Sequence, residues 1–138
     1  MKVLGLDVGD KKIGVALSDE LGLTAQGLTV IYRTSLKKDL EEIKKIIELH
    51  NITEVVIGYP RNMNGTAGPR AELVERFARE LYKFIGIKPV FWDERLSTVE
   101  AEKLLISGDI SRRKRKKVID KLAATLILSG YLNYKSKN

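Results

Sequence analysis

The chain has 138 residues, 43% of them hydrophobic, which suits one folded domain over residues 1–138 and excludes a disordered chain. The absence of cysteine excludes disulfides and thiolate metal sites. We find neither a secretory leader nor an apolar span of membrane length, so we expect a cytoplasmic protein without a membrane partner. The net charge is +7, which favours an acidic partner.

The first twenty residues predict a hairpin of two strands, residues 2–8 and 12–19, joined by the short link 9–11. Residues of the first strand alternate between an apolar face, Leu4, Leu6 and Val8, and a face of small or acidic residues, Gly5, Asp7 and Gly9. The second strand also has one face of small residues. Small side chains let a helix, a ligand or a metal come close, and Asp7 lies on that face.

Strands and helices alternate along the rest of the chain. We expect a strand at 28–32, a helix at 36–49 capped by Ser35, a buried strand at 54–57 and a loop at 58–68. A helix should follow from Pro69 to about 85, and then a strand at 88–92. The last part of the chain predicts a helix from a capping box at 97 to about 106, a basic loop at 108–115, and a last helix from about 116 to 134. The order predicts an α/β fold. Its mixed five-stranded sheet, three antiparallel strands and then two parallel ones, would be flanked by helices.

Three acidic positions lie in or at the end of apolar runs, namely Asp7, the pair Asp93-Glu94, and Asp120. A lone carboxylate is costly to desolvate there, so such residues pair, bind backbone N–H groups or hold a metal. Ligands of open α/β sheets lie at the carboxyl ends of the strands, where the first two positions are expected. We predict that Asp7, Glu94 and Asp120 bind one or two Mg²⁺ or Mn²⁺ ions that act on a phosphate.

The adjacent acids Asp93 and Glu94 point to opposite faces if their strand continues, so one of them enters the site. We favour Glu94 because its side chain is longer, with Asp93 holding Arg95 or supporting the site. Structural roles remain open for each position. Asp7 could satisfy backbone in a Gly-rich turn, the pair could cap the next helix, and Asp120 could be a surface residue.

The excess positive charge lies in the last 30 residues. Residues 1–108 have 16 basic and 16 acidic side chains, and residues 109–138 have nine basic and two acidic ones. The run 112–117 contains six consecutive cations, which suits either a solvated segment or a phosphate-backbone contact. Candidates for nucleic-acid binding are Lys11, Lys12, Arg61, Asn62, Asn64, Arg70, Arg95, Arg112, Arg113, Arg115 and Lys116.

Together, several segments resemble the YqgF (RuvX) family over about residues 2–134. They are Gly5-Leu6-Asp7-Val8-Gly9, Lys12-Ile13-Gly14-Val15-Ala16, Gly58-Tyr59-Pro60-Arg61-Asn62-Met63-Asn64-Gly65, Asp93-Glu94-Arg95-Leu96-Ser97-Thr98 and Asp120-Lys121-Leu122-Ala123-Ala124. The resemblance implies an RNase H-like fold and a metal-dependent nuclease that matures the 5′ end of pre-16S rRNA, described earlier as a Holliday-junction resolvase. It also implies that Asp7, Asp93, Glu94 and Asp120 are the catalytic acids.

One departure from the related resolvases concerns the strand beside the first, which ends in Ile57-Gly58 without an acid. The missing acid would come from Asp93-Glu94, one strand further out. With strands about 4.8 Å apart, Glu94 would have to reach across two spacings.

Four functions compete at this point. The first is a nuclease that trims precursor rRNA, which could act on a pre-ribosomal particle. The second is a DNA junction resolvase, which would require a homodimer instead of a monomer because symmetric cleavage needs two sites. The third is an ATP-binding domain of the actin and sugar-kinase type, although such proteins bind nucleotide between two domains. The fourth is a non-catalytic RNA-binding assembly factor that uses the run 112–117.

Overall fold

The computed structural model describes residues 1–60, 68–93 and 112–136, and within the last range it describes side chains from residue 122 onward. Its centre is one five-stranded sheet in the order β3-β2-β1-β4-β5. The strands are β1 (Val3–Val8), β2 (Lys12–Ser18), β3 (Ala25–Tyr32), β4 (Glu54–Tyr59) and β5 (Val90–Asp93). The first three pair antiparallel, and β4 and β5 continue the sheet parallel to β1, so the predicted mixed topology is confirmed.

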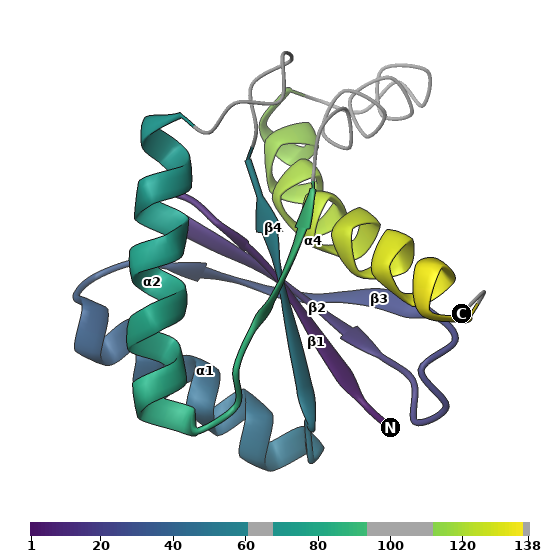
Figure 1. Cartoon of the computed structure of the whole chain (residues 1–138). Coiled ribbons are helices and arrows are strands. Elements are labelled where there is room, and N and C mark those ends of the chain that lie inside the picture. Colours follow the sequence, from purple (N-terminus) through teal and green to yellow (C-terminus); the bar gives the residue numbers. More distant parts are fainter. Residues whose placement is uncertain (61–67, 94–111, 137–138) are drawn as a thin grey trace.

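Helices cover both faces of the sheet (Figure 1). The helices α1 (Leu36–His50) and α2 (Pro69–Ile85) lie on one face, and α4 (Arg112–Ser136) crosses the other. The predicted cap at Ser35 is present, because its side chain accepts a hydrogen bond from the N–H of Lys38. Pro69 begins α2 as expected, and Gly86, with φ of 78°, ends it in the left-handed conformation that glycine adopts easily. None of the described helices has the length and apolar character that crossing a membrane requires.

The alternation predicted for β1 and β2 produces two cores of different composition. The face toward α1 and α2 is built from large aliphatic side chains, including Leu4, Leu6, Ile13, Val15 and Ile57. The core toward α4 has fewer buried residues, which include Ala16, Val56, Ala124, Ile127 and Leu128. One strand therefore supplies both layers, and each layer contacts different helices.

The expected boundaries were wrong in several places. The third strand begins at Ala25 rather than 28, since it pairs with β2 back to Ser18 across a bulge at Val15/Ala16. The expected loop 58–68 begins too early, because Gly58 and Tyr59 pair with β5. The fifth strand is shifted from 88–92 to Val90–Asp93.

The expected basic loop 108–115 is also wrong over its last four residues, because α4 already begins at Arg112. Arg and Lys are good helix formers, and the run continues the helix that the apolar residues after it define. The predicted helix at 97–106 and residues 61–67 of the predicted loop lie outside the described residues.

Candidate active site at the carboxyl end of the sheet

Asp7 lies at the carboxyl end of β1, the middle strand of the sheet. Its side chain is 19% exposed and lies on the sheet face that α4 covers, whereas the neighbouring Leu6 lies on the face toward α1 and α2. Its partner in β2 is Gly14, which adds no side chain beside it. The guanidinium of Arg70, in the first turn of α2, lies 3.3 Å from Asp7 Oδ1 and 3.4 Å from the carbonyl oxygen of Val8. This partly buried carboxylate is thus accessible and balanced by a cation.

The turn that follows Asp7 is held by a buried ion pair that the sequence analysis missed. Gly9 N–H donates to the carbonyl of Lys12 at 2.8 Å, and Arg33 Nη1 donates to the carbonyl of Gly9 at 3.0 Å. Arg33 Nε lies 2.9 Å from Asp39 Oδ2, and Asp39 is only 2% exposed. The Arg33 guanidinium also lies 5.2 Å from the ring centroid of Phe77. The sequence signal for this pair was an acid in the first turn of a helix, Asp39, six residues after the cation that follows the third strand, Arg33.

Helix α4 approaches β1 closely because Gly5 has no side chain. A Cβ atom at Gly5 would lie 2.8 Å from Leu128 Cβ and 3.3 Å from the carbonyl oxygen of Ala124. Further along α4, Tyr131 and Lys135 bind Glu54 at the start of β4. The helix therefore runs antiparallel to β1 and β4, and its amino-terminal half extends toward the end where Asp7 lies, as Figure 1 shows.

The contact at Glu54 fixes the other end of α4. Lys135 Nζ lies 2.5 Å from Glu54 Oε2, and the Tyr131 hydroxyl donates to Oε1. Burial raises the pKa of Glu54, but hydrogen bonds from Lys135 and Tyr131 outweigh it and bring the pKa below its ordinary value. Burial, together with the nearby carboxylate, raises the pKa of Tyr131. The tyrosine stays a neutral donor, and the contact holds the helix against β4.

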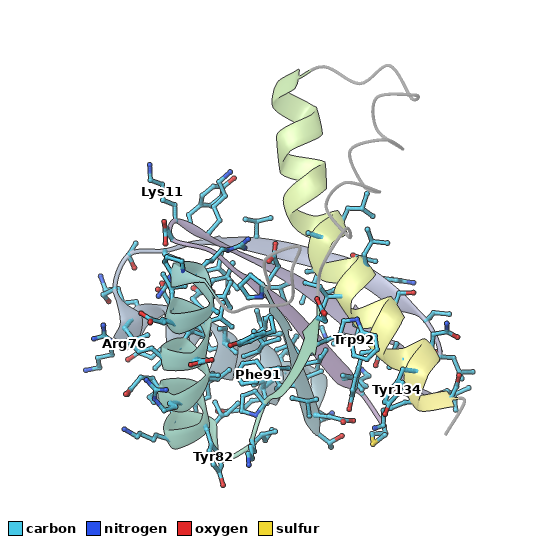
Figure 2. All side chains as sticks on the ribbon, turned by 45° about the horizontal axis from the view of Figure 1, so that its top comes forward. Lys11, Arg76, Tyr82, Phe91, Trp92 and Tyr134 are labelled. Atoms are coloured by element: carbon cyan, nitrogen blue, oxygen red, sulfur yellow. The ribbon has the colours of Figure 1, made fainter. Side chains whose placement is uncertain are left out.

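Asp93, at the end of β5, belongs to the face opposite Asp7. By strand register it pairs with Tyr59, whose ring is in the layer toward α2, and it lines a pocket there. As the last residue of the strand, Asp93 also lines a second pocket beside Trp92 and α4. Its neighbour Trp92 faces α4, where its ring centroid lies 6.0 Å from that of Tyr131. Figure 2 shows Phe91 on the α2 side of β5 and Trp92 on the α4 side. Glu94, the next residue, lies outside the described residues.

Asp120 is a helical residue one turn before Ala124 in α4, and its side chain is outside the described part. Among the side chains that are described, no group of three or more acidic, histidine or cysteine residues could hold a metal ion. The fold thus brings Asp7 and the amino-terminal half of α4 to one end of the sheet. The carboxylates expected to complete the site are not among the described side chains.

The candidate basic residues are placed unevenly. Lys11 is exposed at the hairpin tip (Figure 2), Lys12 is half-buried at the start of β2, and Arg70 contacts Asp7. Four others, Arg61, Asn62, Asn64 and Arg95, lie outside the described residues. The remaining four, Arg112, Arg113, Arg115 and Lys116, form the first turns of α4, and only their backbone is described.

The sequence profile of the RuvX family, whose description is "Holliday junction resolvase", matches residues 1–134. The chain belongs to the RuvX family. The resemblance seen in the motifs is therefore confirmed over nearly the whole chain.

Relatives of this RuvX-family chain are named as nucleases. A protein of Carboxydothermus hydrogenoformans, named "Putative pre-16S rRNA nuclease", is 96% identical over 138 residues and is covered completely. A Halothermothrix orenii protein of the same name is 54% identical, over 99% of this chain and 98% of its own length.

Solved structures share the fold at low sequence identity. Thermus thermophilus RuvC in complex with a Holliday junction is 14% identical, with a TM-score of 0.59 over 99% of this chain and 96% of its own. The fowlpox virus resolvase with junction DNA is 12% identical, with a TM-score of 0.58 over 98% of this chain and 99% of its own. The RNase H-like fold predicted from the sequence is thereby confirmed.

Proposed function

We propose that this chain is a metal-dependent nuclease that hydrolyses RNA phosphodiester bonds during 5′-end processing of pre-16S rRNA. The observation that carries the proposal is the position of Asp7, an accessible carboxylate at the carboxyl end of the middle strand, on the face that α4 approaches. Family membership and the name of the 96% identical relative support the same activity and substrate. Residues 1–138 would act as one nuclease domain.

Asp7, Glu94 and Asp120 would hold Mg²⁺ or Mn²⁺. The described part of this donor set fits such an ion, because the Asp7 carboxylate offers hard oxygen ligands and is partly exposed. A metal ion bound at Asp7 would replace Arg70 as the cation beside this carboxylate. The bound metal supplies an activated water and stabilises negative charge on the phosphate. Asp120 is a candidate metal ligand because α4 runs toward Asp7. It lies one helical turn before Ala124, whose carbonyl oxygen is close to Gly5 of β1.

Glu94 is the preferred ligand of its acidic pair. The register of β5 with β4 puts Asp93 on the α2 side of the strand, and successive residues of an extended strand point to opposite faces. We therefore assign Asp93 a supporting role near Arg95 and Glu94 a direct one. The two roles can be tested separately. If Glu94 binds the metal and Asp93 only supports the site, Glu94→Gln should lower the cleavage rate far more than Asp93→Asn.

Substrate contacts would come from cations around the same end of the sheet. Lys11 and Lys12 belong to the hairpin after Asp7, and Arg70 begins α2. The first turns of α4, with the run 112–117, would extend this contact, together with Arg61, Asn62, Asn64 and Arg95. A nuclease acting on precursor rRNA, free or in a pre-ribosomal particle, would work in the cytoplasm.

The test is metal-dependent cleavage of a precursor 16S 5′-leader RNA by the wild type, Asp7→Asn and Asp10→Asn. Asp10 is an exposed acid in the same hairpin and serves as the matched control. Losing metal catalysis worth several kcal/mol should lower the rate of Asp7→Asn about a thousandfold or more. EDTA should abolish cleavage by the wild type, and Asp10→Asn should remain active. Equal cleavage by wild type and Asp7→Asn would overturn the proposal.

A second substrate deserves the same assay because the family description is that of a Holliday junction resolvase. Paired symmetric nicks in a four-way DNA junction, with a homodimer in solution, would favour this alternative. A monomer that cuts only the RNA leader would favour rRNA processing.

A further inference from the structure

A pocket opens on the α2 side of the sheet, away from Asp7. Its volume is about 460 Å³, which lies within the range of small-ligand pockets. It runs between α2 and β5, the edge strand of the sheet. Its lining residues include Tyr59, Glu75, Arg79, Tyr82, Lys88 and Phe91.

Aromatic rings make up much of the wall. Tyr82 is 47% exposed and Phe91 is 42% exposed, although side chains of this size usually gain from burial. The rings of Tyr59 and Phe91 lie 5.1 Å apart between centroids, and the Tyr59 hydroxyl donates to Glu75, which fixes that ring. In Figure 2, Phe91 lies between β5 and α2, and Tyr82 lies at the far end of α2. The pocket therefore offers accessible ring faces on a rigid support.

Two cations line the same pocket. Arg79 and Lys88 have no carboxylate within ion-pair distance among the described residues. By contrast, Lys83 on α2 pairs with Glu80 at 3.5 Å. Two carboxylates also line the pocket, but Glu75 accepts a hydrogen bond from Tyr59 and Asp93 lies at the upper end. Accessible rings beside cations that pair with no described carboxylate suit a ligand that has both an aromatic ring and negative charge. Such a combination is typical of sites for unpaired nucleotides.

The pocket reaches the end of the sheet where the candidate active site lies. Tyr59 and Asp93, the last residues of β4 and β5, line its upper end, and Asp7 ends β1 at the same edge. A strand bound across this edge could thus place one nucleotide near Asp7 and a neighbouring one beside α2.

We propose that this pocket binds an unpaired base of the RNA strand, with the base stacked on Tyr82 or Phe91 and its phosphate beside Arg79 or Lys88. The inference rests on the proposed nuclease function and gives it a substrate class, single-stranded RNA flanking the cut. The pocket shares Asp93 with the candidate acids at its upper end, and the rest of it lies on the sheet face opposite Asp7.

The first test measures binding of a fluorescent single-stranded RNA by anisotropy, in the Asp7→Asn background so that no cleavage occurs. Tyr82→Ala should weaken binding at least about fivefold through lost stacking, and Tyr82→Phe should retain it. Phe84→Ala is the matched control, because Phe84 is an exposed aromatic of the same helix that does not line the pocket. With Phe91→Ala measured alongside, equal binding by Tyr82→Ala, Phe91→Ala and Phe84→Ala would overturn the proposal.

The second test examines the cations through salt dependence. Losing one phosphate contact should reduce the slope of log K against log salt by about 0.7 in Arg79→Ala. Arg76→Ala is the control, because Arg76 is exposed on α2, does not line the pocket and points away from β5 in Figure 2. Identical slopes for the two variants would contradict a phosphate contact at Arg79.

The third test locates the base directly. RNA containing 5-iodouridine should photo-crosslink to Tyr82 or Phe91, and peptide mass spectrometry would identify the residue. Crosslinks found only elsewhere would overturn the pocket assignment and would leave the groove free for another partner, such as a peptide added to the β5 edge.

The two proposals fail in different ways. If the wild type cuts RNA and the Tyr82→Ala, Phe91→Ala and Phe84→Ala variants bind RNA alike, the pocket proposal is wrong and the nuclease proposal stands. If no substrate is cut but Tyr82→Ala selectively weakens binding, the nuclease proposal is wrong and base binding stands.

Discussion

The two faces of the sheet differ in the size of their side chains. Toward α1 and α2, the strands present Leu, Ile and Val, and the helices bury Ile43, Val74, Phe77 and Leu81 against them. Toward α4, β1 and β2 present Gly5, Asp7, Gly14 and Ala16. The first face gains most from apolar burial, and the second permits the close approach of a helix.

The difference indicates a division of work between the faces. The large aliphatic face can stabilise the fold without any ligand, so the opposite face can keep a carboxylate and leave space around it. The carboxylate stays at the strand end, where it is reached from outside, and the small residues lie further down the strand under α4. Removing a large side chain from the face toward α1 and α2 should therefore mainly lower stability, and replacing Asp7 on the face toward α4 should mainly lower activity.

The sharpest test compares consecutive residues of β1. Leu6→Ala removes a fully buried side chain from the aliphatic face and should lower the free energy of unfolding by about 2–5 kcal/mol. Asp7→Asn removes a partly exposed ion pair with Arg70 and should change stability by about 1 kcal/mol or less. Urea denaturation of both variants checks this, and cleavage assays should show the reverse order. A large loss of stability in Asp7→Asn would break the division.

The buried ion pair under the hairpin should show the next largest effect. Asp39→Ala leaves the Arg33 guanidinium without its carboxylate and should lower the free energy of unfolding by about 3 kcal/mol. Because Arg33 also holds the carbonyl of Gly9, cleavage should fall as the turn after Asp7 loosens. Glu42→Ala, an exposed acid of the same helix, is the control for denaturation and activity. Equal stability of the two variants would mean that the pair contributes little.

Gly5→Ala tests the approach of α4. The new methyl group would meet Leu128 Cβ at 2.8 Å, an atom near the helix backbone that moves only with the helix. Overpacking of this kind should cost about 1–3 kcal/mol in denaturation experiments. A shift of α4 should also displace Asp120 relative to Asp7 and lower cleavage under conditions where the variant is folded. A variant as stable and active as the wild type would contradict the close packing.

The contact at Glu54 should give the smallest effect and a pH signature. The pKa of Glu54 is lowered from an ordinary value of 4.5, so its contribution to stability is present above that pH and is lost as the pH falls through the lowered pKa. Glu54→Gln should thus be less stable than the wild type by about 1 kcal/mol at neutral pH, and the difference should shrink in acid. Thermal unfolding from pH 7 to 3 measures this, with Glu72→Gln, an exposed acid of α2, as control. A difference independent of pH would contradict the assignment.

Several features could be predicted from the sequence because they depend on neighbours in the chain. Alternation of apolar and small residues in β1 gives its two faces, and Ser35 and Pro69 mark helix starts through their own backbone and side-chain chemistry. The strand order also followed, since parallel strands joined through helices leave few topologies. The start of α4 could not be predicted, because six cations in a row fit a solvated loop as well as a helix until the rest of the helix packs on the sheet.

The sequence by itself determined the five strands and the helices that follow β3 and β4, together with the acidic positions, because periodicity and capping act over a few residues. Only the tertiary structure decided that Arg70 lies beside Asp7, that Arg33 and Asp39 hold the hairpin, and that Asp93 belongs to the α2 face. It also decided that Tyr59, Tyr82 and Phe91, far apart in the chain, line one pocket. Apart from the Arg33–Asp39 pair, whose residues lie six positions apart, such contacts depend on strand register and on how each helix packs on the sheet. Packing between distant segments fixes both, and it leaves no local pattern in the chain.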